Sequence, residues 1–157
     1  MSNPLIIAVG ADHGGFPLKE TIKSFLTKQG YQVIDCGTDS TEAVDYPVFA
    51  AKVARKVASG AARFGIVVDG AGIGSSMAAN KIPGVRAALC YDLSSANNAR
   101  EHNDANILTL GSGLIGSSLA QQIVIKFITT DCTEERHLRR VAMINDLQTE
   151  KGNIEKM

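Results

Sequence analysis

The stretch Gly65-Ile66-Val67-Val68-Asp69-Gly70-Ala71-Gly72-Ile73-Gly74 carries the clearest fold signal in this chain. Its first four residues form a continuous apolar run, which is typical of a strand buried on both faces of a parallel sheet. Alternating glycines follow this run, and a helix is expected from Ser75 onward. Strand, glycine loop and helix in this order predict one unit of an α/β fold.

Comparable units recur along the chain. The other apolar runs cover residues 5–9, 32–34, 85–89 and 106–110. The stretches between the runs carry apolar residues at helical spacing, and two of them begin with a proline, Pro17 or Pro47, suited to a first helical turn. Strand and helix repeated five times predict a doubly wound, five-stranded parallel sheet in the order 2-1-3-4-5.

The composition restricts the classes of function. The 157 residues are one domain's worth, so we expect a single domain over residues 1–157. Basic and acidic residues number 16 each, which gives no electrostatic reason to expect nucleic acid or a membrane surface as a partner. No membrane span or secretory signal is visible, and three widely spaced cysteines suggest neither disulfides nor a zinc site. We therefore expect a cytoplasmic protein with reduced cysteines.

The segment 133–150 reads as a helix that is strongly charged, and no sixth strand follows it. Such an appendage either packs on a neighbouring subunit or lies in solvent on its own domain. The sequence leaves both arrangements open.

In a doubly wound sheet, ligands bind beyond the carboxyl ends of the strands, at the point where the strand order reverses. For the predicted order, this point lies between the first and third strands. The loops that meet there are residues 10–15 and residues 69–74, which are the two most polar and glycine-rich loops of the chain. The second loop and the helix after it could bind an anion through backbone N–H groups, or could form only a tight turn.

Three further features carry possible chemistry. Asp69 could cap the following helix, act as a general base, or accept a phosphoryl group, although the other acidic and lysine positions of a phosphoacceptor domain are missing. His102 is either a solvated helix end or a proton-transfer group near the same carboxyl edge. Arg136 and Arg140 share a helix face at a spacing that suits a phosphate, or belong to a surface charge run.

Taken together, these segments resemble the ribose-5-phosphate isomerase B / galactose-6-phosphate isomerase family over about residues 5–144. The blocks that carry the resemblance are Ala11-Asp12-His13-Gly14-Gly15, Val44-Asp45-Tyr46-Pro47, the 70–74 loop, Ala78-Ala79-Asn80-Lys81, Arg86-Ala87-Ala88-Leu89-Cys90, Arg100-Glu101-His102-Asn103-Asp104-Ala105-Asn106, and Arg136-His137 followed by Arg140.

The resemblance implies a Rossmann-like fold, a homodimer or homotetramer with sites built from two subunits, and aldose–ketose isomerisation of a sugar phosphate without metal or other cofactor. It implies Asp69 and His102 as catalytic residues, with Arg136 and Arg140 of the partner subunit binding phosphate. The substrate-binding residues that it implies are Asp12, His13, Tyr46, Gly70, Ala71, Gly72, Ile73, Gly74 and Asn103.

The chain departs from the family pattern at the base and at the phosphate. Isomerase B members usually carry a cysteine base where this chain has Asp69, and often Thr or Ser at Ala71. A phosphate-binding arginine is replaced by Gly113, and Ser75 stands where some members carry a glutamate base. We expect a ribose-5-phosphate isomerase in which Asp69 takes the place of the usual cysteine base. The alternatives are an isomerase for a tetrose, galactose or allose phosphate, and a non-catalytic subunit of a hetero-oligomer.

Overall fold

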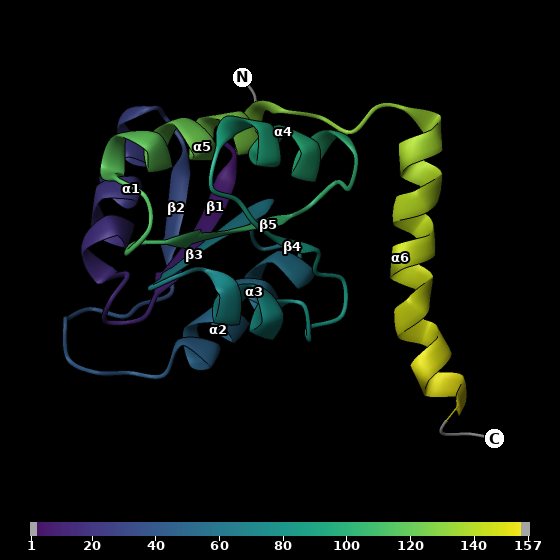
Figure 1. The fold of residues 1–157 in the computed structure, drawn as a ribbon, viewed down its shortest axis with the longest axis horizontal. Coiled ribbons are helices and arrows are strands. Elements are labelled where there is room, and N and C mark those ends of the chain that lie inside the picture. Colours follow the sequence, from purple (N-terminus) through teal and green to yellow (C-terminus); the bar gives the residue numbers. More distant parts are fainter. Residues whose placement is uncertain (1–2, 155–157) are drawn as a thin grey trace.

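The computed structural model describes residues 3–154 and contains a five-stranded, fully parallel sheet with helices on both faces (Figure 1). The strands are β1 (Ile6–Ala11), β2 (Gln32–Asp35), β3 (Phe64–Asp69), β4 (Ala87–Leu89) and β5 (Ile107–Gly111). The predicted α/β class and doubly wound parallel sheet are confirmed, and each of the five strands overlaps one of the five apolar runs.

The predicted strand order 2-1-3-4-5 is wrong in its last two strands, because the observed order is β2-β1-β3-β5-β4. All five residues of β5 are buried, and the strand pairs with β3 along its whole length. β4 has three half-buried residues and follows the charged Arg86. A fully apolar strand belongs inside the sheet and a short, half-buried one at its edge. The reversal point between β1 and β3 is unaffected.

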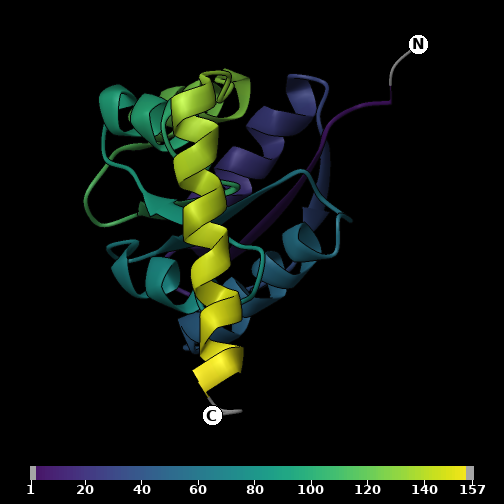
Figure 2. The same ribbon diagram turned by 90° about the vertical axis from the view of Figure 1, so that its right-hand side faces the viewer.

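The helices divide between the two faces of the sheet (Figures 1 and 2). One face is covered by α1 (Phe16–Lys28), α4 (Leu93–Glu101) and α5 (Ser117–Thr129), which enclose the larger apolar core. The other face is covered by α2 (Tyr46–Ala58) and α3 (Ile73–Ala79) over a smaller core. Prolines in the first turns of α1 and α2 act as the sequence predicts.

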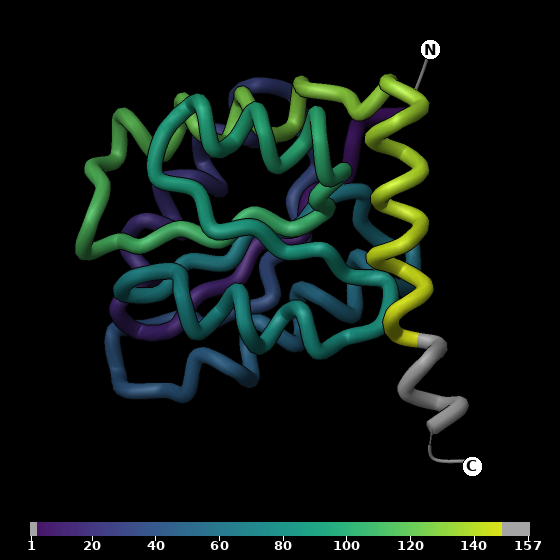
Figure 3. The backbone as a smooth tube through the Cα atoms, turned by 45° about the vertical axis from the view of Figure 1, so that its right-hand side comes forward, coloured from purple at the N-terminus to yellow at the C-terminus, as the bar shows by residue number. Residues whose placement is uncertain are grey.

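The helix expected over residues 133–150 is observed as α6 (Glu135–Ile154), which stands apart from the layered body (Figures 1 and 3). Two hydrogen bonds tie its later turns to the loop before β4: Arg86 donates to the Asn145 side chain at 3.1 Å, and the Gly84 amide donates to Gln148 at 3.1 Å. Within residues 3–154, no helix is both long enough and apolar enough to cross a membrane.

At the outer edge of the sheet, Asp35 at the end of β2 binds two lysines of α1. Lys19 Nζ lies 2.7 Å from Oδ1 and Lys23 Nζ lies 2.8 Å from Oδ2, while the Gly37 amide donates to Oδ1 at 2.9 Å. Burial opposes ionisation of Asp35, but the three hydrogen bonds outweigh it and lower its pKa from 3.8 to about 2. Because the Lys19 side chain is 1% exposed, this cluster fixes α1 against β2.

We expect the cluster to contribute stability in full above pH 3.8 and to lose it as the pH falls through about 2, where folded Asp35 takes up a proton. Asp35→Asn should lower the free energy of unfolding at pH 7 by about 1–3 kcal/mol. It should also flatten the dependence of that free energy on pH between these two values. Urea unfolding at a series of pH values measures both effects.

The matched control is Asp39→Asn, which changes an exposed carboxylate in the following loop. Equal pH slopes for Asp35→Asn and the unaltered chain would contradict the assignment.

Candidate active site

The two polar loops predicted to meet do lie side by side, beyond the carboxyl ends of β1 and β3. The Asp12 amide donates to the Val68 carbonyl at 3.3 Å, and Asp12 Oδ1 accepts the Gly15 amide at 2.9 Å. A Cβ atom on Gly15 would overlap the Val68 carbonyl, so only glycine allows this approach. His13 Nδ1 lies 3.2 Å from both the carbonyl oxygen and the amide nitrogen of Val44, with its role set by the tautomer.

The four carbonyl groups of residues 69–72 accept hydrogen bonds from residues in or just after β5 and β4. The bonds run from the Ser112 amide to the Asp69 carbonyl (2.8 Å), the Gly113 amide to Gly70 (3.0 Å), the Tyr91 hydroxyl to Ala71 (2.6 Å) and the Thr109 hydroxyl to Gly72 (2.7 Å). In a trans peptide the N–H points opposite to the C=O, so the loop amides face away from β5. In the described part of the chain, the amides of Gly70 and Ala71 have no acceptor.

The carboxylate of Asp69 turns into its own loop, which is the helix-capping arrangement left open by the sequence. One oxygen accepts the Gly72 amide in a short hydrogen bond, and the other accepts the Ser75 amide at 3.2 Å. The residue is 5% exposed. Within residues 3–148, Ser75 Oγ is the buried side-chain polar atom that has no hydrogen-bond partner. Its residue adjoins the carboxylate, because the Ser75 amide donates to Asp69.

No cysteine takes the place of Asp69 at the end of β3. All three cysteines are free, and Cys90 lies in the larger core at the end of β4. Burial raises the pKa of Cys90 to about 11, so the group remains a thiol at neutral pH. The Asp69 carboxylate, in contrast, directly accepts the amides of Gly72 and Ser75.

The expectation that His102 lies near the same carboxyl edge is wrong within one chain. α4 starts beyond the carboxyl end of β4 and runs back for nine residues, roughly 13 Å, before it ends at His102. β5 begins only after this point, so His102 and Asn103 lie at the amino edge of the sheet. In a parallel sheet, a residue at the end of a crossover helix is necessarily at the edge opposite the strand-end loops.

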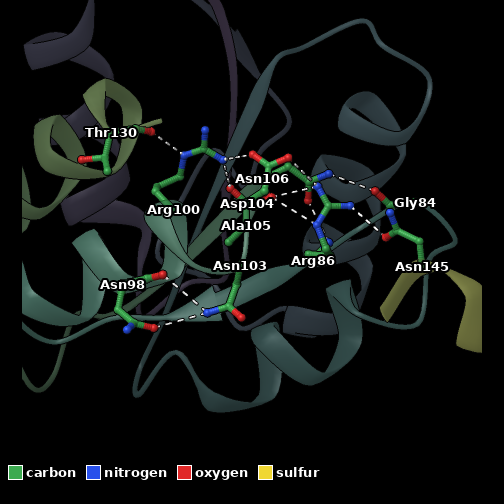
Figure 4. A network of polar contacts seen from close by, with 10 residues as sticks. All are labelled: Gly84, Arg86, Asn98, Arg100, Asn103, Asp104, Ala105, Asn106, Thr130 and Asn145. Atoms are coloured by element: carbon green, nitrogen blue, oxygen red, sulfur yellow. Dashed lines mark hydrogen bonds and ion pairs between the residues drawn. The ribbon is translucent and has the colours of Figure 1, made fainter. Parts of the chain in front are cut away.

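A buried ionic network fixes the corner that carries His102 and Asn103 (Figure 4). Arg100, 1% exposed, donates to the Asp104 carboxylate at 2.8 Å, to the Ala105 carbonyl at 2.7 Å and to the Thr130 carbonyl at 3.0 Å. Arg86 binds the Asp104 carbonyl from the other side at 2.8 Å. Asp104 adopts a left-handed φ of 45°, which turns the chain sharply after Asn103.

The first turns of α6 lie against the same corner. The rings of His137 and His102 stack with centroids 4.1 Å apart and planes inclined by 18°. Burial, the nearby His102 ring, Arg136 and Arg140 lower the pKa of His137 below its ordinary value. Arg136 and Arg140 are exposed and flank His137 in the sequence of α6.

The structure thus divides the predicted residues into two groups at opposite edges. The carboxyl-edge group consists of Asp12, His13, Tyr46, Asp69, Gly70, Ala71, Gly72, Ile73 and Gly74. The amino-edge group consists of His102, Asn103, Arg136 and Arg140. Tyr46 joins the first group because its ring occupies the space where a Gly74 side chain would lie.

Sequence reasoning missed the hydroxyl groups that hold the glycine loop, namely those of Tyr91, Thr109 and Ser112. Ser112 is the first residue after β5 and Tyr91 the second after β4, and that position was the available signal. Ser112 Oγ also donates to the Gly14 carbonyl at 2.9 Å and so joins both polar loops. Within residues 3–154, no three His, Cys, Asp or Glu side chains are grouped so that they could hold a metal ion.

The fold and the two polar edges define a Rossmann-like α/β protein with the layout of a small-molecule enzyme. Residues 7–144 match the family model described as Ribose/Galactose Isomerase, and the chain belongs to this family of isomerases.

Named relatives agree with the family. The chain is 43% identical over 146 residues to ribose-5-phosphate isomerase B of Escherichia coli, covering 93% of this chain and 98% of that enzyme. A structure of Clostridium thermocellum ribose-5-phosphate isomerase B is 48% identical with a TM-score of 0.92, covering 94% of this chain and 99% of that one. A type B ribose 5-phosphate isomerase structure from Trypanosoma brucei is 44% identical with a TM-score of 0.89, covering 92% and 99%.

We expect Gly15→Ala to separate the two polar loops, because its methyl group overlaps the Val68 carbonyl. Overpacking of this kind should lower Tm by roughly 3–10 °C. Gly116→Ala is the control, because a Cβ there meets nothing within 4 Å. Thermal unfolding followed by circular dichroism compares the two variants. A Tm for Gly15→Ala equal to that of the control would show that the close approach does not restrain the loops.

Proposed function

We propose that the protein catalyses metal-independent aldose–ketose isomerisation of a sugar phosphate through an enediolate, with ribose 5-phosphate as the first substrate to consider. The observation that carries this proposal is the Asp69 carboxylate beside the acceptor-free amides of Gly70 and Ala71, at the point where the strand order reverses. Membership of the Ribose/Galactose Isomerase family and the names of the relatives support the substrate class.

The reaction moves one proton between adjacent carbons and consumes no oxidant. A base removes the proton from C2 of the open-chain aldose, and negative charge develops on the carbonyl oxygen. Backbone N–H groups aimed at that oxygen stabilise the enediolate, which is the role we assign to Gly70 and Ala71. The proton then returns to C1, and a hydroxyl proton moves from O2 to O1, which leaves the ketose.

Asp69 is the base in this proposal. Each carboxylate oxygen that accepts an amide hydrogen bond keeps a second lone pair, so capping the loop and accepting a proton are compatible. The two amides also fix the direction of the carboxylate before substrate arrives. Asp12, His13 and Tyr46 lie at the same edge and are the groups proposed to contact the sugar.

The amino-edge group reaches such a site from a second copy of the chain. His102 assists ring opening in this proposal, Asn103 binds substrate, and Arg136 and Arg140 bind the phosphate. None of these can serve the carboxyl edge of its own chain, because α4 separates the two edges. α6 supports the same arrangement, since it stands off the body with exposed apolar side chains that a second copy would cover. These side chains are Leu138, Met143, Ile144 and Leu147. We therefore propose a homodimer, or a homotetramer built from it, with shared active sites.

A different sugar phosphate is the second candidate, and the loop itself favours it. Gly113 offers no cation for a phosphate, and a Cβ there would lie 3.1 Å from the Gly70 carbonyl. Ala71 likewise offers no hydroxyl. A tetrose, galactose or allose phosphate would place its phosphate at another distance from the base.

We expect Asp69→Asn to reduce kcat by about 10²–10⁴-fold, because the amide cannot accept the proton. The fold should persist, since asparagine also caps helices. Asp69→Cys should retain partial activity, because a thiolate can act as the base. The measurement is aldose–ketose interconversion with ribose 5-phosphate, and with tetrose and hexose phosphates as competing substrates.

Unchanged turnover in Asp69→Asn would remove Asp69 from the role of base. A higher kcat/KM for another sugar phosphate would select the second candidate. Absence of turnover for every sugar by the unaltered protein would favour a non-catalytic subunit that needs a different partner chain.

Shared sites predict complementation between two inactive variants. Asp69→Asn and His102→Asn each disable both sites of a homodimer. In a randomly mixed population, half of the dimers contain one of each chain and one intact site, so activity should recover to about a quarter of the normal value. The measurement is turnover after co-expression of the two variants.

Each variant co-expressed with a tagged copy of itself is the control and should stay inactive. If a site were complete within one chain, the mixed dimers would contain no intact site. Absence of recovery in dimers that have been shown to contain both variants would therefore overturn the shared arrangement.

A further inference from the structure

Tyr91 lies at the carboxyl edge of the sheet, two residues after β4, and has no part in the function proposed above. Its side chain is 36% exposed, but its hydroxyl donates a 2.6 Å hydrogen bond to the Ala71 carbonyl, 20 residues away in the chain. The backbone of Tyr91 is anchored, because its amide donates to Ser95 Oγ at 3.2 Å and Asp92 caps α4. The hydroxyl therefore reaches the glycine loop from a fixed position.

The bond acts on a peptide group that also contacts Asp69. The carbonyl of Ala71 and the amide of Gly72 belong to one planar peptide and point in opposite directions. The Tyr91 hydroxyl binds the carbonyl end, and the Gly72 amide donates to the Asp69 carboxylate. One rigid plane thus links the tyrosine to the proposed base, and hydrogen bonds in such a chain strengthen one another.

Among the described residues, this peptide has two hydrogen bonds, one at its carbonyl end and one at its amide end. Within residues 3–154, the hydroxyl of Tyr91 is the donor to the Ala71 carbonyl, and Ala71 has no polar side chain of its own. The neighbouring residues Gly70 and Gly72 are glycines, whose backbone rotates with few steric limits, and Gly72 has a left-handed φ of 78°. Without the tyrosine bond, rotation about ψ of Ala71 and φ of Gly72 would turn this peptide and move the Gly72 amide away from the Asp69 carboxylate.

We propose that Tyr91 is a positioning residue that sets the Asp69 carboxylate through the Ala71–Gly72 peptide and its Gly72 amide. The proposal rests on the isomerase function given above. Tyr91 need not touch the substrate in this role. Its effect falls on the transition state, when the proton leaves carbon and charge develops on oxygen, and not on the initial binding of the sugar phosphate.

The test is Tyr91→Phe, which removes the hydroxyl and keeps the ring. We expect kcat for ribose 5-phosphate to fall about 10–100-fold, which is less than the loss of a whole oxyanion donor, with KM changed less than about threefold. A planar sugar-phosphate hydroxamate, which resembles the enediolate, should lose affinity by the same factor as kcat. The matching sugar-alcohol phosphate does not resemble the enediolate, and its affinity should stay unchanged.

Tyr31→Phe is the matched control, because Tyr31 is half-buried before β2 at the other edge of the sheet. Its kcat and hydroxamate affinity should stay unchanged. An unaltered kcat in Tyr91→Phe would overturn the proposal. So would a rise in KM alone, or an equal loss of affinity for both analogues, since these point to a direct contact with substrate.

Hydrogen exchange of the Gly72 amide separates this proposal from the proposed function. Tyr91→Phe should accelerate that exchange about tenfold or more, while the core strands stay protected, because local opening of the loop becomes easier. This result holds whether or not the protein turns over a sugar phosphate. Unchanged exchange would overturn the positioning role even in an active isomerase.

Discussion

The parallel pairing of β1 with β3 is the constraint on which the rest of the structure depends. The register sets Ala11 beside Val68, so the chain leaves both strands at the same edge and Asp12 and Asp69 emerge into neighbouring loops. The close approach of Gly15 to the Val68 carbonyl locks this contact. Because all five strands run in one direction, every loop after a strand falls at this edge and every helix end before a strand falls at the other.

The same directionality gives α4 two roles. At its start, the anchored Tyr91 reaches the glycine loop of its own chain, and at its end His102 and Asn103 lie at the opposite edge beside α6. In the proposed function, the site uses both edges, and for this reason we proposed that two chains build it. The network of Arg100, Asp104 and Arg86 holds the far end of α4, and the capping box of Asp92 and Ser95 holds the near end.

Much of this was predictable because it has a periodic signal. Continuous apolar runs gave the strands, helical spacing and prolines gave the helices, and the reversal point gave the meeting of the loops at Asp12 and Asp69. The prediction for the order of β4 and β5 was wrong, because that order depends on which strand is more fully buried. The charged Arg86 just before β4 is consistent with an edge position for β4. The position of His102 at the amino edge was also predicted wrongly, although it follows from the direction of α4, which runs from the end of β4 back to the start of β5. The Tyr91 contact with Ala71 leaves no pattern, since it joins two single residues 20 apart.

The aspartate at the base position changes how the loop can work. A carboxylate has two oxygens, so Asp69 can bind the amides of Gly72 and Ser75 and still present lone pairs, whereas a cysteine offers one sulfur atom. The amides of the loop are thereby divided into two sets: those of Gly72 and Ser75 bind the carboxylate, and those of Gly70 and Ala71 are the ones we proposed for the substrate oxygen. This division works only while the Ala71–Gly72 peptide keeps its orientation, because that peptide separates the two sets. With aspartate at this position, the orientation of the Ala71–Gly72 peptide also sets the carboxylate, and the Tyr91 hydroxyl holds that peptide from outside the loop.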